Sequence, residues 1–248
     1  DIKNRRCPAV EKGKCIGCQP CNIMCGLGGA GGMSSGVLNL RHDIGGDLSK
    51  FTGDRKSAER LVEEVDKIFL EHGAPQELYG ENNDGVQELT LRAAASGIKF
   101  IPIIQRHIGS EHLPAVMTSF REFMEKKGVR FMHNTKVERI EKNRVIVDGK
   151  SIEADYIVAA PGRIGAEWFA EQARNLGAEL SHGPIDIGVR VEIPAVVYES
   201  LVRVNRDPKF HIRTRTFDDF VRTFCTNANG YVMEERYENH VGVNGHSL

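Results

Sequence analysis

The sequence lacks a charge excess, a long hydrophobic run and a large aromatic content. Aromatic residues make up 7% of 248 residues, and 33 Lys and Arg against 34 Asp and Glu give a formal net charge of -1. No window approaches the roughly 18 consecutive apolar residues of a membrane helix, and the N-terminal stretch has no apolar signal core. We therefore expect a cytoplasmic protein with no membrane segment.

Nucleic-acid binding is also not expected. The balanced charge leaves no global field that would attract a polyanion. One group of basic residues near the C-terminus is interleaved with acidic and β-forming residues, and no aromatic stacking platform accompanies it. The group comprises Arg203, Arg206, Lys209, Arg213, Arg215 and Arg222.

Hydrophobic periodicity predicts several helices and strands in a chain of ordinary globular composition, with 40% hydrophobic residues. Helices are expected over 57–70, 86–95, 110–127, 166–176 and 196–204. Strands are expected over 99–104, 129–132, 136–141, 144–147 and 185–193. The apolar run from Asp155 to Ala160 predicts a strand buried on both faces, and the break at Pro161-Gly162 falls where an α/β fold places its ligand loops.

Cysteine is sparse but clustered. Four of the six cysteines form the pattern C-x2-C-x2-C-x3-C at Cys15, Cys18, Cys21 and Cys25, the spacing used by ferredoxin-type iron–sulfur clusters. Zinc and unliganded thiols are the alternatives, although zinc usually takes two separated pairs. Gly26 stands where ferredoxin motifs carry proline, and Cys7 and Cys225 are alternative fourth ligands.

A glycine-rich loop follows the cysteines. The segment from Gly26 to Gly32 matches G-x-G-x-x-G, but cysteines precede it instead of a strand and a poor helix start follows, so we reject it as a pyrophosphate loop. A bare backbone that lets a flat cofactor approach is the preferred interpretation, and a tight turn packed under another segment is the alternative. The candidate cofactor-binding residues here are Gly29, Ala30, Gly31, Gly32, Ser34 and Ser35.

Arg106 and His107 form a candidate substrate-binding pair. They precede an expected helix start at Ser110, where a cation and an imidazole suit an anionic substrate. The alternative is a solvated arginine beside a packed histidine. No residue is assigned as a catalytic acid or base.

The stretch from Phe123 to Arg163 resembles the two-dinucleotide-binding flavoproteins. It offers a helix, GVRFMHNTKVERI, a hairpin and then ADYIVAAPG, where many relatives have Ala-Thr-Gly. The resemblance implies that Val137 lends backbone groups to the adenine of FAD and that the Ala160-Pro161-Gly162 turn lies against the cofactor. Pro161 departs from the family threonine and removes a hydroxyl. An unrelated meander with a proline turn is the alternative.

Blocks over nearly the whole chain resemble one group, the uncharacterised FAD-dependent dehydrogenases. In order they are RRCP, CIGCQPCNI, GGAGGMSSG, PIIQRHIGSEHL, IDIGVRVE, RTFCTNANGYV and VNGHS. Relatives tend to carry an acidic residue where this chain has Ser34-Ser35. Members begin with a strand–GxGxxG–helix unit and end with an FAD-contacting segment. Neither is present in a chain that starts at Asp1, so the resemblance implies an internal fragment that binds FAD poorly, because a pyrophosphate site on the first helix supplies much of the affinity.

We therefore predict an α+β chain with two interleaved parts. Residues 1–53 and 108–165 would form an incomplete Rossmann-like FAD/NAD(P)-binding part, and residues 54–107 and 166–248 a mixed-sheet substrate domain. The resemblance implies part of an FAD-dependent dehydrogenase acting on a small-molecule substrate, coupled to an iron–sulfur cluster if the cysteines hold one, with a ferredoxin-like protein or NAD(P)H as redox partner. The alternative is a non-enzymatic cysteine-rich module that binds iron–sulfur or zinc.

Overall fold

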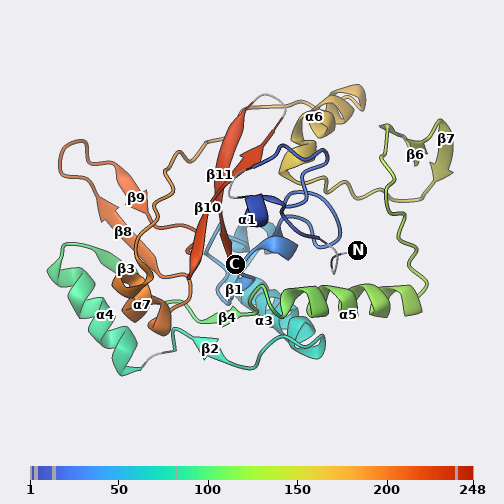
Figure 1. Cartoon of the computed structure of the whole chain (residues 1–248). Coiled ribbons are helices and arrows are strands. Elements are labelled where there is room, and N and C mark those ends of the chain that lie inside the picture. Colours follow the sequence, from blue (N-terminus) through green and yellow to red (C-terminus); the bar gives the residue numbers. More distant parts are fainter. Residues whose placement is uncertain (1, 3–4, 13–14, 82, 238–239, 248) are drawn as a thin grey trace. The chain divides into compact units, whose positions relative to one another are not determined.

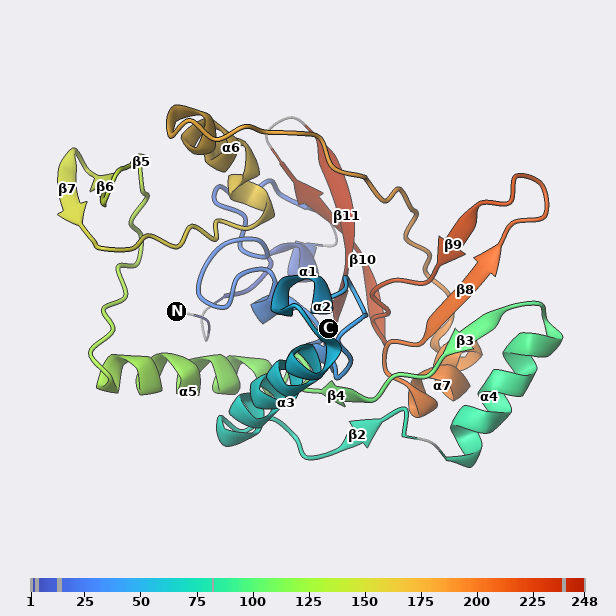
Figure 2. The same ribbon diagram turned by 180° about the vertical axis from the view of Figure 1, so that it is seen from behind.

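The chain is an α+β protein whose strands form small antiparallel sheets. The structure is a computed structural model and describes residues 2, 5–12, 15–81, 83–237 and 240–247. The chain divides into two compact units, one formed by Asp1–Phe120 with Arg190–Leu248 and the other by Arg121–Val189. Each unit is described by itself, and Figures 1 and 2 show the elements from opposite sides.

The first unit contains a sheet of order β1-β4-β2, formed by Val37–Asn39, Gln105–His107 and Leu78–Tyr79. Helix α3 (Arg55–Glu71) begins where the Asp54 carboxylate accepts a hydrogen bond from Ser57 N at 2.9 Å. A short helix α2 (Ser49–Thr52) precedes it. Beside them, Ile108 packs with buried residues from the start of α5 (Leu113–Lys126). This core fixes the strand that carries Arg106 and His107.

A second sheet in the same unit has the order β3-β8-β9, formed by Lys99–Ile101, Lys209–Arg213 and Phe220–Arg222. Helices α4 (Asp84–Ala95) and α7 (Ala195–Val204) lie along it (Figure 2). Their apolar side chains form a core with Phe100 and Phe210, so one face of this sheet is covered. The core of this second sheet therefore combines residues 86–100 with residues 201–210, whereas the core beside the first sheet comes from residues 38–120.

The hairpin of β10 (Gly230–Arg236) and β11 (Val241–Ser247) belongs to the first unit and is drawn in red in Figure 1. Met233 of β10 packs against Ile23 and Met24 of the cysteine-rich segment. That segment contains α1 (Ala9–Lys12) and the 3-10 turn η2 (Gly31–Met33). The cysteine-rich segment and the glycine loop therefore pack against this hairpin.

The second unit contains an antiparallel meander and a helix. The meander joins β5 (Arg139–Glu141), β6 (Arg144–Val147) and β7 (Lys150–Glu153), and the 3-10 turn η3 (Arg163–Gly165) leads into α6 (Ala166–Asn175). Ile140 N donates to Gln172 Oε1 at 3.0 Å, and Trp168 Nε1 donates to Glu138 O at 3.0 Å. These two hydrogen bonds attach the helix to the meander.

The α+β class and the predicted helices are confirmed, but several predicted strands are wrong. The segments 129–132, 155–160 and 185–193 contain no strand, and 99–104 is a strand only over Lys99–Ile101. The run at 155–160 is not buried, since Tyr156 and Val158 are each 91% exposed. Extended segments need a partner to satisfy their backbone groups, and no strand among the described residues pairs with these.

The predicted mixed sheet is also wrong within the described chain, because every recorded strand pairing is antiparallel. The helix-linked parallel crossovers that define a Rossmann-like sheet are not formed by these residues. We predicted a cofactor part formed by 1–53 with 108–165 and a substrate part formed by 54–107 with 166–248. These parts are defined by function, so they stay a prediction. The compact units of the structure have other bounds.

Gly80 marks the tightest backbone approach in the first unit and provides a test of the fold. Its φ is +76°, and an added Cβ would lie 2.1 Å from Ile103 O and 2.2 Å from Asn205 Nδ2. Gly80→Ala should cost about 2–4 kcal/mol of unfolding free energy, from the left-handed backbone and the overpacking together.

Gly97→Ala is the matched control, since φ is +71° but nothing lies within 4 Å of an added Cβ. It should cost only about 1 kcal/mol. Denaturant unfolding of both variants measures the difference, and equal losses would show that the close approach at Gly80 is not present.

Candidate cofactor and metal sites

The cysteines gather beside the β10–β11 hairpin. Cys7, Cys21 and Cys25 are half-buried and pack against the core formed by Ile23, Met24 and Met233. Tyr231 of β10 packs against the same core. The thiols therefore lie on folded structure that brings residues far apart in sequence to one place.

Arg5 organises the turn that carries these cysteines. Its guanidinium donates hydrogen bonds to Asn22 O at 3.1 and 2.9 Å and to Ile23 O at 2.8 Å. It also donates to Leu27 O and Gly29 O, each at 2.8 Å. The planar guanidinium, with its several fixed donors, thus hydrogen-bonds to carbonyl groups of both the cysteine turn and the glycine loop.

The sulfur atoms receive hydrogen bonds. Gly17 N donates to Cys15 Sγ at 3.5 Å, and the Arg236 side chain also bonds to Cys15. Cys7 accepts a hydrogen bond from the backbone of Ala9. Burial raises the pKa of the Cys7 thiol, and the neighbouring thiols raise it further. Amide donors aimed at sulfur are the outer-shell arrangement that stabilises a bound thiolate.

The cysteines have the chemistry that suits a thiophilic metal, but their side chains are not arranged around a single point. Thiolate sulfur is the preferred donor for zinc and for iron–sulfur clusters. Within the described residues, no three Cys, His, Asp or Glu side chains are close enough together to hold an ion. The predicted ligands Cys15, Cys18, Cys21 and Cys25 therefore stay a prediction that requires the side chains to converge on the metal.

The glycine loop divides into packed and open positions. An added Cβ at Gly32 would lie 2.9 Å from Ile2 Cδ1, and at Gly26 it would lie 3.1 Å from Arg5 Cδ. Gly29 and Gly31, by contrast, have nothing within 4 Å of an added Cβ. Part of the loop is thus glycine because the chain packs on itself, and Gly29 and Gly31 are where another molecule can approach the backbone.

The two serines predicted as cofactor donors form hydrogen bonds within the protein. Ser34 Oγ donates to Gly31 O at 2.8 Å and accepts from Gly36 N at 3.1 Å. Ser35 O accepts from Gly109 N at 3.0 Å, which ties the loop to the segment before α5. The loop is thereby held in one conformation, which suits a preformed binding surface, and the cofactor roles of Ala30, Ser34 and Ser35 stay predictions.

The remaining predicted cofactor residues belong to the second unit. Val137 is half-buried just before β5, and Ala160 and Gly162 are exposed. Gly162 has φ +69°, precedes η3, and has nothing within 4 Å of an added Cβ, whereas the Pro161 ring lies against Gly165. The turn is therefore open to approach at Gly162.

Arg106 has a structural role that the sequence did not reveal. Its side chain is 4% exposed and binds both carboxylate oxygens of Asp66, at 2.5 and 2.7 Å, and also Pro75 O at 2.7 Å. These bonds hold the guanidinium inside the protein between α3 and the sheet. A substrate role for Arg106 stays a prediction. It would require the guanidinium to bind the substrate while it keeps, or gives up, some of its bonds to Asp66 and Pro75.

His107 is the half-buried member of the predicted pair. Burial lowers the pKa of its imidazole, and nearby Arg206 lowers it further, while Glu111 and Glu77 oppose the shift. Its ring meets that of Tyr79 edge-on, and Arg206 Nη2 donates to the Tyr79 hydroxyl oxygen Oη at 3.0 Å. A neutral imidazole beside a guanidinium can accept a proton from an acidic ligand or hydrogen-bond to it.

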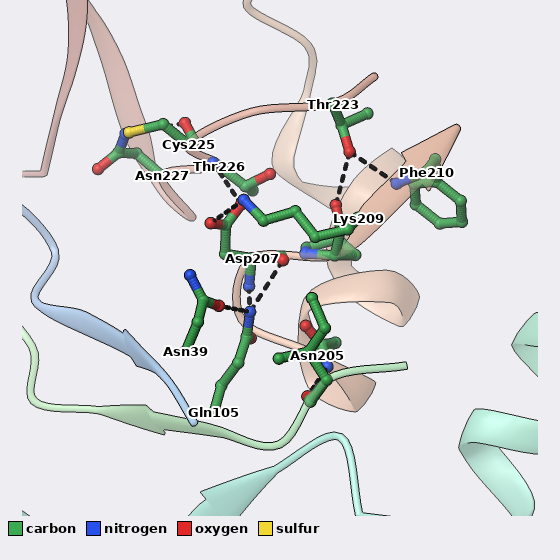
Figure 3. Close-up of polar contacts among 12 residues, drawn as sticks. Asn39, Gln105, Asn205, Asp207, Lys209, Phe210, Thr223, Cys225, Thr226 and Asn227 are labelled. Carbon is green, nitrogen blue, oxygen red and sulfur yellow. Dashed lines mark hydrogen bonds and ion pairs between the residues drawn. The ribbon is translucent and has the colours of Figure 1, made fainter. Parts of the chain in front are cut away.

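A buried polar network, missed by the sequence analysis, lies between the β1-β4-β2 and β3-β8-β9 sheets (Figure 3). Gln105 is fully buried, donates to Asn39 Oδ1 at 2.7 Å and Asp207 O at 3.0 Å, and accepts from Asp207 N at 3.0 Å. Asp207 in turn pairs with Lys209 and accepts from Thr226 N at 2.9 Å. Because Gln105 and Asp207 are 102 positions apart, no local pattern indicates this contact.

Cys225 lies at the edge of this network, away from the other cysteines in its contacts. Its φ is +55°, and its carbonyl accepts from Arg190 Nη1 at 2.5 Å. The side chain of Asn227 lies 3.7 Å from its sulfur. Its partners are therefore polar groups of the network, as Figure 3 shows for Asn227, and not the thiols of the cysteine cluster.

An apolar groove of about 460 Å³ opens beside the network. It is lined from α4, α7, β8 and β9, and Tyr198 forms part of its wall. Burial raises the pKa of the Tyr198 hydroxyl, which also bonds to Thr226. The volume is in the range of small-molecule sites, and Tyr198 and Thr223 supply polar groups on an apolar wall.

The chain has a distant similarity to a longer protein. The chain is 24% identical over 230 residues to an uncharacterised protein of Clostridium beijerinckii. The aligned part is 86% of this chain but 35% of that relative, so the chain spans well under half of the relative's length. No family model matches the chain, and no solved structure matches it.

Double variants test whether Arg106 serves the fold. Asp66→Leu or Arg106→Met alone should lower the unfolding free energy by about 3–5 kcal/mol, because each leaves a buried charge without its partner. Combining the two should recover most of the loss, as measured by denaturant unfolding. Additive losses in the double variant would contradict a buried pair.

A pH dependence follows from His107. Its folded-state pKa lies below the ordinary value, so the unfolded chain binds the proton more readily. Unfolding free energy should therefore fall as pH drops from the ordinary histidine range through the lower folded pKa. His107→Gln should flatten this slope in unfolding titrations between about pH 7 and 5. His133→Gln, at an exposed position, is the control, and identical slopes in all three proteins would refute the assignment.

Proposed function

We propose that this chain is part of an FAD-dependent oxidoreductase, a dehydrogenase of small molecules with a metal-binding cysteine cluster. The observation that carries the proposal is a set of unpartnered apolar positions. Ile185, Ile187, Val189 and Val191 alternate along one segment and are 82, 91, 88 and 71% exposed. Alternation with a period of two is a strand pattern, and single strands are not stable alone.

A second unpartnered stretch lies before the predicted cofactor turn. Tyr156 and Val158 are both 91% exposed, directly ahead of Ala160-Pro161-Gly162. Exposed apolar runs of this kind mark a surface that another element covers. In a flavoprotein of the resembled type, the covering element would be the cofactor-binding sheet, to which segments beyond these residues would contribute. The relative's greater length supports the same proposal.

The groups that would contact a flavin are chiefly backbone groups. Gly29, Gly31 and Gly162 are open to close approach, and Val137 would lend its amide and carbonyl. Bound flavin supplies hydride and electron transfer, so these residues would bind and orient it. His107 would hold or release a proton on the substrate side, where its lowered pKa keeps the imidazole neutral near pH 7.

The groove is a second proposed place for a small-molecule substrate, separate from Arg106 and His107, which do not line it. All of its lining residues fall within 54–107 and 166–248, the predicted substrate domain. Its apolar wall favours a substrate with an apolar part, and Arg92 and Arg222 at the lining favour an acidic group on it. A ferredoxin-like protein or NAD(P)H remains the proposed redox partner.

The proposal includes a cytoplasmic location and no nucleic-acid partner. Among the described helices, none has the length and apolar content to cross a membrane. Several of the basic residues named above are engaged within the chain: Arg203 with Glu199, Lys209 with Asp207, Arg213 with Asp218, and Arg206 with Tyr79. This pairing reduces the positive charge available to a phosphate backbone.

A cysteine-rich metal-binding interaction module is the second candidate. The gathering of thiols beside the β10–β11 hairpin favours it, since that cluster needs no flavin to bind a metal. The two candidates differ in one observable, which is flavin binding by the protein that includes the flanking sequence.

Flavin titration tests the main proposal. The 248-residue chain should bind FAD weakly or not at all, because it lacks the helix N-terminus that holds the pyrophosphate. The same chain with its native flanking sequence should copurify with FAD and show the two-banded flavin absorption. Absence of flavin from the extended protein, after reconstitution with FAD, would refute the oxidoreductase proposal and leave the metal-binding module.

Polar substitution tests the unpartnered segment. In the 248-residue chain, Ile187→Ser should reduce self-association, measured by light scattering, without lowering the melting temperature, because the side chain is exposed. In the extended protein the same change should lower the melting temperature, since the side chain would be covered there. Leu91→Ser, at a helix position that is 72% exposed, should leave the melting temperature unchanged in both. An extended protein insensitive to Ile187→Ser would refute the covering sheet.

A further inference from the structure

We infer that the open face of the β3-β8-β9 sheet is a docking surface for an acidic segment of a partner protein that also presents an apolar side chain. The inference goes beyond the proposed function, and it requires neither flavin nor metal. The opposite face of this sheet carries Phe100 and Phe210 and is covered by α4 and α7 (Figure 2). The docking surface is the side of the sheet that these helices leave uncovered.

The strand register determines which side chains share the open face. Lys99 of β3 lies opposite His211 of β8, and His211 lies opposite Arg222 of β9. Side chains alternate between the two faces along a strand, so these three point away from Phe100 and Phe210. A row of basic side chains thus crosses the sheet from one edge strand to the other.

The row lies among like charges. None of the three strands contains an Asp or a Glu. Burial lowers the pKa of His211, and the charges of Lys99 and Arg222 lower it further. Like charges that face one another across strands destabilise a sheet, so an acidic side chain bound between them would relieve the repulsion.

Two exposed phenylalanines belong to the same surface. Phe220 is 54% exposed, and its ring meets that of His211 edge-on with 4.9 Å between the ring centroids. Phe224 follows β9 and is 66% exposed, with Lys209 Nζ 5.4 Å and Arg222 Cζ 5.6 Å from its ring centroid. Exposed apolar side chains with a polar rim mark interaction surfaces, and aromatic residues and arginine are enriched in protein interfaces.

The charge balance favours a protein segment over a nucleic acid. Lys209 is paired with Asp207, and Arg213 is paired with Asp218. Lys99 and Arg222 then carry most of the positive charge that the surface can offer. Nucleic-acid binding depends on many phosphate contacts at once, whereas a protein interface needs a few complementary charges around an apolar anchor. The inferred occupant is therefore a segment with carboxylates on either side of an apolar residue.

A pair of synthetic peptides tests the inference on the 248-residue chain. The probe is an end-blocked peptide of glutamates that carries two tryptophans, and its counterpart has lysine in place of every glutamate. At low ionic strength the acidic peptide should shift the backbone NMR signals of Lys99, His211 and Arg222, and about 0.5 M salt should abolish the shifts. Absence of these shifts, or equal shifts with both peptides, would overturn the inference.

Charge reversal locates the binding. Lys99→Glu should weaken binding of the acidic peptide about threefold or more, because an attraction becomes a repulsion. Lys50→Glu is the matched control, since Lys50 is exposed on α2 and the same charge is reversed there. Equal loss in the two variants would show that only the net charge matters and would overturn the inference. The peptide shifts in the wild-type chain do not depend on the folding of either variant.

Two further measurements separate the other possible occupants. Single-stranded oligothymidine should bind more weakly than the acidic peptide, and tighter binding that Lys99→Glu weakens would identify a nucleic-acid surface instead. The protein with its native flanking sequence should bind the acidic peptide as the 248-residue chain does. Loss of binding there would show that the flanking sequence covers this face, and it would overturn the inference. Flavin titration would still decide the oxidoreductase proposal separately.

Discussion

The hydrogen bonds of the Arg5 guanidinium are the contacts on which the arrangement of residues 22–29 depends. The guanidinium is a single planar cation that bonds carbonyl groups of Asn22, Ile23, Leu27 and Gly29. This one side chain determines where the cysteine turn ends and where the glycine loop begins. The backbone at Gly26 and Gly32 also lies close to the side chains of Arg5 and Ile2, so a larger residue at either position would require these side chains to shift. A lysine, with a point charge in place of a fork of donors, could not satisfy this set of acceptors.

Sequence reasoning predicted what local periodicity determines and missed what distant contacts determine. The helices at α3, α4, α6 and α7 follow from their own apolar spacing and lie close to the expected bounds. The stretches 155–160 and 185–193 have strand composition, but strands exist only with partners, and composition does not reveal whether a partner is present. The buried ion pair of Arg106 was not predicted, since its carboxylate partner Asp66 is 40 positions away. The cysteine motif was found from spacing, whereas the place of Cys7 beside it depends on tertiary structure.

The thiol cluster and the glycine loop pack against the same core, so molecules bound at the two places would lie close together. Both are held by Arg5 and both lie on the core beneath the β10–β11 hairpin. A metal at the cysteines and a flat molecule at Gly29 and Gly31 would therefore be joined by a short, hydrogen-bonded stretch of backbone. A change of charge at one position would act on the other through few intervening atoms and in a partly desolvated setting. In the proposed oxidoreductase, such proximity would let electrons pass between the metal site and the flavin.

The first unit is built from both ends of the polypeptide, with the second unit between them in sequence. Strand β3 pairs with β8, and Gln105 bonds to Asp207 across 102 positions. During synthesis the N-terminal half therefore leaves the ribosome long before its partner strand exists. At typical rates of translation the interval is roughly 5–20 s. Over that time the amide of Gln105, fully buried in the finished protein, has only water to bond to, and the exposed face of Phe100 is open to chaperones. The order of the segments along the chain thus delays closure of the first unit until Asp207 and strand β8 have been made.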